Sequence, residues 1–181
     1  APDPSANNLY LSAMGNRRIR RITLATGVVE TVAGNGKAGK PEDGAVAKDA
    51  PLSDPRAVVA AADGSFYILE RNGNALRFVD TAGKIRTVAG NGKSGLSGDG
   101  GPALEATMSG PKHLCLDRDG SVIIADAENQ VVRRYDPKTA PIPRPPGPGH
   151  QGHPGPAGAP PPPHPARPPP PTPPPTATPR P

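Results

Sequence analysis

The chain has 181 residues, of which 34% are hydrophobic and 3% aromatic, and it carries a formal net charge of +5. It has no run of 18 apolar residues, which excludes a candidate transmembrane helix. Its single cysteine, Cys115, excludes a disulfide within the chain.

Composition divides the chain into two parts. Residues 140–181 hold 21 of the 29 prolines, and we expect a disordered or semi-rigid polyproline tail there because proline removes backbone donors and few apolar side chains are available. Residues 1–139 are the predicted folded part. They carry 18 basic and 16 acidic residues, a near balance that disfavours a nucleic-acid partner.

The predicted folded part is an internal repeat. "TVAGNGKAG" at 31–39 recurs as "TVAGNGKSG" at 87–95, an offset of 56 that also relates 54–64 to 110–120 and 66–80 to 122–136. An earlier copy, "LYLSAMGNRRIRRI" at 9–22, fits at an offset of 57. One complete copy and two partial copies are therefore present.

In chain order, the complete copy predicts four strands, at 56–61, 66–70, 75–80 and 84–89. They are separated by "ADG", "NGN" and "TAG", and Asp-Gly and Asn-Gly between apolar runs are strong hairpin signals. Four antiparallel strands per unit are typical of a propeller blade. A long connection, 90–111, follows the fourth strand, and "PALEA" at 102–106 predicts a short helical turn within it.

The glycines of this connection include the spacing G-x-G-x-x-G at Gly90, Gly92 and Gly95. A dinucleotide site would need a helix after the glycines, and a Walker A motif would need glycine at Thr87. We therefore interpret these positions as turns and connectors. The set with this structural role is Gly34, Gly36, Gly39, Gly90, Gly92, Gly95, Gly98, Gly100, Gly101, Asp126 and Asn129.

Three segments resemble NHL-repeat β-propellers, in particular bacterial members with long inter-blade loops: "DGSFYILERNGNALRFVD" at 63–80, "TVAGNGKSGLSGDGGPALEATMSGP" at 87–111 and "DGSVIIADAENQVVRRYD" at 119–136. The resemblance implies an all-β fold of four-stranded antiparallel blades, here an incomplete array. No copy has the histidine of the Asn-His-Leu-like stretch, which stands as 129–131, 73–75 and 17–19. Members of the family mostly bind proteins, sometimes RNA, and a minority of related propellers are metal-dependent lactonases or lyases.

No catalytic, metal or cofactor site is predicted. His113 is the one histidine of residues 1–139, and "DRDG" at 117–120 lacks the further ligands of an EF-hand calcium loop. We interpret Asp126, with Asn129, as a turn in which the carboxylate accepts backbone N–H groups two or three residues later. A metal-dependent lactonase- or lyase-type propeller, with its ligands in missing blades, is the alternative from the enzyme class.

RNA binding through a stripe of arginines is the second alternative. Few aromatic side chains are available for base stacking, so a solvated strand face is favoured over this alternative. The arginines are Arg17, Arg18, Arg20, Arg21, Arg77, Arg133 and Arg134. Cys115 alternates with leucines in a first strand and is predicted to be buried.

The tail contains a further regularity. Five glycines between Gly147 and Gly158 lie 57 residues after those between Gly90 and Gly101. We favour a truncated or frame-shifted end of a longer propeller; a collagen-like segment and a polyproline ligand for aromatic grooves are the alternatives.

The predicted function is a non-catalytic binding module, a fragment of a secreted or cell-surface propeller. Loops carry function, so the long connection supplies the candidate ligand residues Lys93, Ser94, Asp99 and Glu105. A protein or a small ligand is the expected partner. An incomplete array also exposes strand edges and blade faces, through which copies could self-associate.

Overall fold

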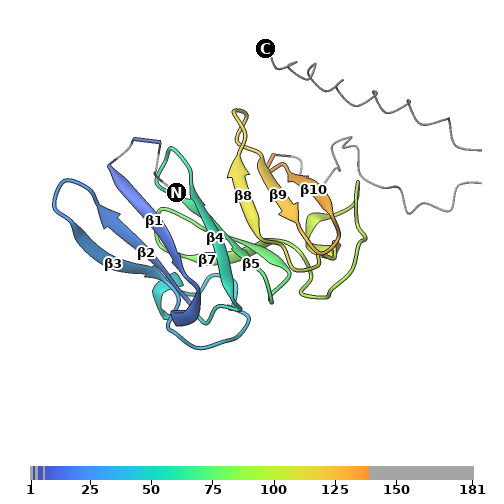
Figure 1. Ribbon diagram of the computed structural model, residues 1–181, viewed down its shortest axis with the longest axis horizontal. Helices are drawn as coiled ribbons and strands as arrows, with labels where there is room; N and C mark the ends of the chain where they lie inside the picture. Colours follow the sequence, from blue (N-terminus) through green and yellow to red (C-terminus); the bar gives the residue numbers. More distant parts are fainter. Residues whose placement is uncertain (1, 3, 6, 139–181) are drawn as a thin grey trace, which may run out of the picture. The chain divides into compact units, whose positions relative to one another are not determined.

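The computed structural model describes residues 2, 4, 5 and 7–138, and its regular elements are strands and short 3-10 turns. The predicted tail, 140–181, lies outside the described residues. Three antiparallel sheets follow one another along the chain, each with its strands in sequence order (Figure 1). The fold is therefore all-β, as predicted.

Each sheet is one blade. The first blade holds β1 (Asn8–Ala13), β2 (Arg18–Thr23) and β3 (Val28–Ala33). The second blade holds β4 (Pro55–Ala60), β5 (Phe66–Glu70), β6 (Ala75–Val79) and β7 (Ile85–Ala89). The third blade holds β8 (His113–Leu116), β9 (Val122–Asp126) and β10 (Val131–Tyr135). The 3-10 turns are η1 (Met14–Asn16), η2 (Ala47–Asp49) and η3 (Ala103–Glu105).

The four strands predicted for the complete copy are confirmed, each to within one residue at either end. Turn chemistry sets these ends: the carboxylate of Asp63 accepts the N–H of Ser65 at 3.0 Å, and that of Asp80 accepts the N–H of Lys84 at 2.9 Å. The helical turn expected within 102–106 is η3.

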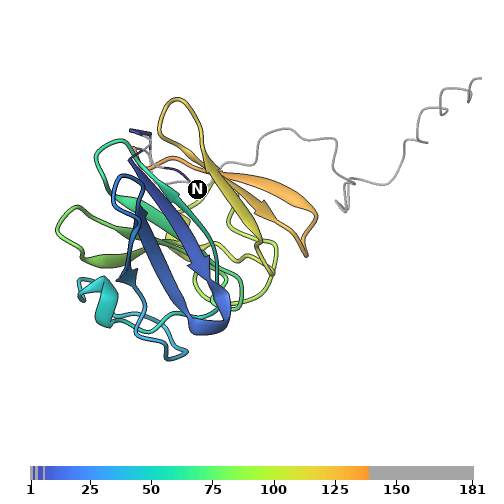
Figure 2. The same cartoon turned by 60° about the vertical axis from the view of Figure 1, so that its left-hand side comes forward.

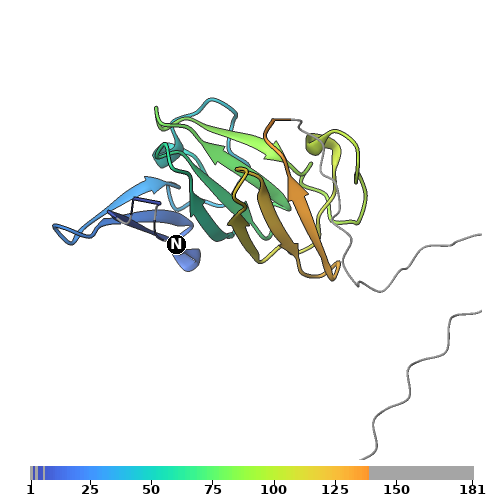
Figure 3. The same ribbon diagram turned by 90° about the horizontal axis from the view of Figure 1, so that it is seen from above.

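Side chains on the two faces of the second blade pack against different neighbours, because successive residues of a strand point to opposite faces. We call the face toward the preceding blade the N-side face and the opposite one the C-side face. Seen from above, the three blades lie side by side in chain order (Figure 3), and β4 contacts β1 on one side and β8 on the other.

The first and second blades share one apolar cluster. Tyr10 and Ile19 of the first blade pack against Phe66 and Ile68 of the second. The rings of Tyr10 and Phe66 lie 5.3 Å apart between centroids. This aromatic pair joins the two blades.

The second and third blades share the other cluster. Tyr67 and Leu76 of the second blade pack with Val122 and Ile124 of the third, and all four side chains are buried. Every blade boundary in the described part of the chain therefore has its own core.

The N-side face of the first blade exposes apolar side chains. Leu11 is 42% exposed and Val29 is 49% exposed. The residues at the same positions of the second blade, Ile68 and Ile85, are fully buried against the first blade. The first blade thus has the apolar pattern of a blade that packs on a neighbour, and no described residue covers it.

The C-side face of the third blade is uncovered in the same way. Val132 is 48% exposed, whereas Leu76 at the same position of the second blade is buried. Cys115 is also exposed, so its predicted burial is wrong. The reason is that its equivalent, Val59, packs against the third blade, while Cys115 faces the side on which the described residues provide no blade.

The turns between β1 and β2, β5 and β6, and β9 and β10 lie at one end of the blades, together with the long connections 34–54 and 90–112 (Figure 1). We call this end the loop face. Each connection runs from the last strand of one blade to the first strand of the next, and the first of them is visible with η2 in Figure 2.

A matched pair of substitutions tests the two environments. We expect Ile68→Ala to lower the free energy of unfolding by about 2 to 5 kcal/mol, because it opens a cavity in the core between blades. Leu11→Ala at the same position of the first blade should change it by about 0.5 kcal/mol. Urea unfolding at low protein concentration measures both, and equal losses would contradict this packing.

Candidate ligand-binding site

The first glycine of each long connection is required by the backbone. Gly34 and Gly90 have φ of 90° and 85°, and a Cβ on them would overlap the carbonyl oxygens of Arg17 and Asn74. Each donates its N–H to the first residue of the following 3-10 turn, at 2.8 and 2.9 Å. These glycines bring each connection against the preceding blade.

The asparagine that follows each of these glycines closes the connection. The side-chain amides of Asn35 and Asn91 donate to the carbonyl of the last residue of η2 and η3, at 2.8 and 2.9 Å. Their oxygens accept the N–H two residues later, at 2.8 and 2.9 Å. The "GNGK" segments are thus connectors, folded alike in both copies.

Two of the four predicted ligand residues have partners within the protein. Asp99 pairs with Arg133 at 2.7 Å, and the hydroxyl of Ser94 lies 3.0 Å from that of Ser109. Lys93 and Glu105 are exposed on the same connection. The four do not converge, and none lines the cavities described below.

A buried ion pair ties the first connection to the second blade. The carboxylate of Glu70 accepts two hydrogen bonds from Arg77, at 2.9 and 2.7 Å, and one from the N–H of Ser53, at 2.7 Å. The two side chains are 0% and 3% exposed. Burial raises the pKa of the Glu70 carboxyl, and Arg77 acts in the opposite direction.

The third blade repeats this arrangement with a shorter acid. Asp126 accepts the N–H of Ser109 at 2.7 Å and the side-chain amide of Asn129 at 2.8 Å, and Arg133 lies 3.6 Å away. Burial raises the pKa of the Asp126 carboxyl, against Asn129, Ser109 and Arg133. The expected pairing of Asp126 with Asn129 is present, but through the side-chain amide of Asn129; the backbone N–H that this buried carboxylate accepts comes from Ser109 in the connection, and not from two or three residues later.

Four arginines of the stripe considered as an alternative for RNA binding are paired within the protein. Arg77 and Arg133 are buried in ion pairs, because their side chains point into the packed face of each sheet. Arg134 pairs with Asp119, and Arg21 pairs with Glu30 at 2.6 Å. These arginines therefore do not present a continuous surface to phosphates.

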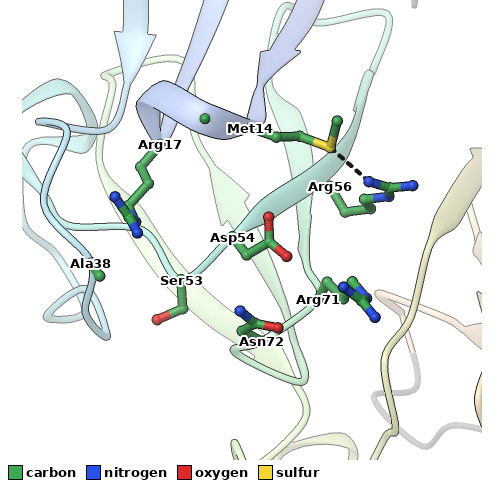
Figure 4. Close-up of a pocket in the computed structure, with 9 residues that line it drawn as sticks. Met14, Arg17, Ala38, Ser53, Asp54, Arg56, Arg71 and Asn72 are labelled. Carbon is green, nitrogen blue, oxygen red and sulfur yellow. Dashed lines mark hydrogen bonds between the residues drawn. The ribbon is translucent and has the colours of Figure 1, made fainter.

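A cavity of about 480 Å³ opens on the loop face at the boundary of the first and second blades (Figure 4). Its walls come from the β1–β2 turn, the end of the first connection, the start of β4 and the β5–β6 turn. We call it the loop-face cavity. Its lining residues are Met14, Gly15, Arg17, Ala38, Ser53, Asp54, Arg56, Arg71 and Asn72.

Three guanidinium groups and one carboxylate line the loop-face cavity. Arg71 pairs with Glu128 at 3.1 Å, and Arg56 donates to the sulfur of Met14 at 2.9 Å. In the described part of the chain, the side chains of Arg17 and Asp54 make no hydrogen bond or ion pair. The cavity thus contains charged groups whose bonding capacity is not used by the protein.

Arg17 and Asp54 both have left-handed backbone, with φ of 48° and 55°. The other blades have Asn74 and Gln130 at the position of Arg17, and Gly110 at that of Asp54. The backbone is left-handed in those blades too, with φ of 41° at Asn74, 55° at Gln130 and 52° at Gly110, so the conformation belongs to the repeat and only the residue types differ. The unusual residues of the cavity are therefore departures from the repeat.

A smaller cavity of about 190 Å³ adjoins the first and shares Ser53 and Asn72 with it. Its other lining residues are Lys40, Gly73, Arg77, Gly90, Asn91 and Gly92. Two of the three glycines of the G-x-G-x-x-G spacing, Gly90 and Gly92, thus form part of the wall of this neighbouring cavity.

Asp54, Arg56 and Arg71 were not predicted as site residues, because the predictions were based on positions that recur in the repeat. The available signal was the opposite one: at an offset of 56, Asp54 becomes Gly110 and Arg71 becomes Ala127. Charged residues that interrupt a repeat at its turns were the usable indication of this site.

Two general features complete the description. Within residues 7–138 and the few described residues before them, His, Cys, Asp and Glu side chains form no group of three that could hold a metal ion. The same residues contain no helix of the length and hydropathy needed to cross a membrane.

Known proteins share sequence and structure with this chain. The sequence profile of the teneurin NHL domain matches residues 1–96. The chain is 27% identical over 144 residues to "Protein SUPPRESSOR OF QUENCHING 1, chloroplastic" of Arabidopsis thaliana, an alignment covering 74% of this chain and 13% of that protein.

Two solved structures show the same arrangement of blades. An auxiliary nutrient binding protein from Bacteroides thetaiotaomicron is 28% identical with a TM-score of 0.59, over 72% of this chain and 35% of that one. Virginiamycin B lyase from Staphylococcus aureus is 19% identical with a TM-score of 0.50, over 76% and 36%, and shows the fold alone. The chain thus spans about a third of these structures and a smaller share of the plant protein.

The buried ion pair under the first connection gives a testable expectation. Glu70→Ala should lower the free energy of unfolding by about 3 to 5 kcal/mol, because Arg77 is left buried without its partner. The exposed ion pair of Arg21 and Glu30 provides the control, and Glu30→Ala should lower the free energy of unfolding by about 0.2 to 1 kcal/mol. Urea unfolding measures both; in addition, hydrogen exchange of the Ser53 amide should accelerate in Glu70→Ala alone, and unchanged exchange would contradict its role.

Proposed function

Because the chain belongs to the NHL-type β-propeller family of the teneurin NHL domain, we propose that it is a non-catalytic binding module whose loop face holds a small ligand. The loop-face cavity carries this proposal. Its volume of about 480 Å³ lies within the usual range of small-molecule sites, about 300 to 1,000 Å³.

The walls of the cavity are fixed before any ligand arrives. Glu70 binds the N–H of Ser53, the residue before Asp54, and it directly precedes Arg71 in the chain. The buried ion pair therefore positions two charged wall residues at once. Preorganisation of this kind reduces the entropy lost on binding.

One relative supports a small ligand over a large partner. The Bacteroides structure at 28% identity is described as a nutrient binding protein, and this chain covers 35% of it. Substitutions in the loop-face cavity test whether this chain also binds a small ligand.

The test is a ligand-observed NMR screen of a defined library of polar metabolites against the full chain. Ala38 is exposed on the cavity wall, so Ala38→Trp should fill the cavity and abolish the saturation-transfer signal of compounds that bind there. Ala62→Trp, at an exposed turn away from the cavity, is the matched control and should preserve the signals. A library without binders, or binders indifferent to Ala38→Trp, would refute the site.

A second copy of the chain is the proposed partner for the open blade faces. Leu11 and Val29 stand where Ile68 and Ile85 pack on the preceding blade, and Val132 stands where Leu76 packs on the following one. A head-to-tail contact between two copies would repeat the packing already present at the internal boundaries.

Sedimentation velocity over a concentration series tests this association. We expect a concentration-dependent rise in sedimentation coefficient, weakened by Leu11→Glu and by Val132→Glu because each places a charge in the apolar contact. Leu24→Glu is the control, since Leu24 is 53% exposed in a turn outside both faces. A chain that stays monomeric throughout, or an equal effect of Leu24→Glu, would contradict the contact.

A further inference from the structure

We infer that the ligand of the loop-face cavity is a small compound that carries both an oxyanion and a hydrogen-bond donor, such as an amino or hydroxy acid. The inference rests on the proposed function and specifies its ligand class. It follows from three observations on the charged groups of the cavity, taken in turn below.

The first observation is an excess of unused donors. Each guanidinium offers five N–H donors in a planar fork that matches carboxylate or phosphate oxygens. Arg17 uses none of them on the described residues, and Arg56 uses one on the Met14 sulfur, a weak acceptor. Arg71 uses one on Glu128. Three arginines around one small cavity favour a bound oxyanion.

The second observation is the unused acceptor. The carboxylate of Asp54 lies in the cavity wall between Arg17 on one side and Arg56 and Arg71 on the other (Figure 4). An ionised carboxylate is an acceptor only and repels a simple anion. A ligand that places an ammonium or hydroxyl group against Asp54 removes this repulsion while its oxyanion binds the arginines.

The third observation is the contrast with the next blade boundary. There, Asn74 and Gly110 occupy the positions of Arg17 and Asp54, and the Asn74 side chain accepts the N–H of Gly110 at 3.1 Å in a buried bond. The two positions satisfy each other at that boundary. Arg17 and Asp54 make no such bond, so the first boundary leaves both groups to an external molecule.

The probes are pairs of acids that differ in the donor. Glutamate is compared with glutarate, which lacks the ammonium group, and gluconate with hexanoate, which lacks the hydroxyls. Glycerol 3-phosphate distinguishes a phosphate from a carboxylate as the oxyanion. Binding to the full chain is measured by isothermal titration at low salt, and glutamate and gluconate should bind at least about 10-fold more tightly than their partners, as expected for hydrogen bonds to a charged group.

Two variants give opposite signatures. Arg17→Asn, which installs the residue type of the second blade, should weaken every acid by about 10-fold or more. Asp54→Asn should weaken glutamate but strengthen glutarate, because it removes both the acceptor charge and the repulsion. Both replacements tolerate left-handed backbone, and their thermal unfolding is checked against that of the parent chain.

Arg118→Met, at an exposed turn between β8 and β9, is the charge-matched control and should leave all affinities unchanged. Equal effects of Asp54→Asn on glutamate and glutarate, or acids bound equally well by Arg17→Asn, would overturn the ligand class. If Ala38→Trp abolishes binding of other compounds while these charge variants do not, the site stands and the ligand class fails. If no compound of either set binds, both fail.

Discussion

The described structure depends on a carboxylate buried at the end of the second strand of a blade. In the second blade, Glu70 neutralises Arg77 and binds the backbone of Ser53, and in the third Asp126 does the same with Arg133 and Ser109. The charges are kept within the protein because each is paired and each remaining oxygen is hydrogen-bonded. Together with the backbone bonds from Arg71 to Asp54 and from Gly73 to Ser53, this pair fixes the end of a long, glycine-rich connection at the first strand of the next blade.

Placing the connection has a direct effect on the site. Ser53 precedes Asp54, and Glu70 precedes Arg71, so one buried interaction orients a carboxylate and a guanidinium of the loop-face cavity. The site is thus built on the same contacts that stabilise the blade. A substitution of the ion pair would therefore alter binding and folding together, whereas Arg17, Ala38 and Asp54 line the cavity without belonging to the pair.

Much of the fold was predictable from the sequence because it depends on local, repeated signals. Apolar runs separated by Asp-Gly and Asn-Gly determined the strands of the second blade to within one residue, and the 56-residue offset identified the connections. Cys115 was mispredicted since alternation shows which side chains share a face but not whether a neighbour covers it. Asp99 was similarly assigned to a ligand by position, whereas its partner, Arg133, lies on a distant strand.

The site was harder to predict, because its residues come from four segments and several of its charged residues break the repeat. Arg17 and Asp54 are distinguished by residue type when the blades are aligned, since the backbone is left-handed at the same positions of the other blades. Sequence reasoning placed the candidate ligand residues on a long connection at the same end of the blades as the loop-face cavity, but it did not select the boundary between the first two blades.

The loop-face cavity lies between two blades that also pack against each other, in a cluster that includes the rings of Tyr10 and Phe66. Arg17 belongs to the first blade, and Asp54 and Arg56 belong to the second. A molecule that binds residues of both blades stabilises their contact. By thermodynamic linkage, a substitution that weakens the contact between Tyr10 and Phe66 then also lowers the affinity of the cavity for that molecule. The packing between these two blades and the affinity for such a ligand are therefore energetically linked.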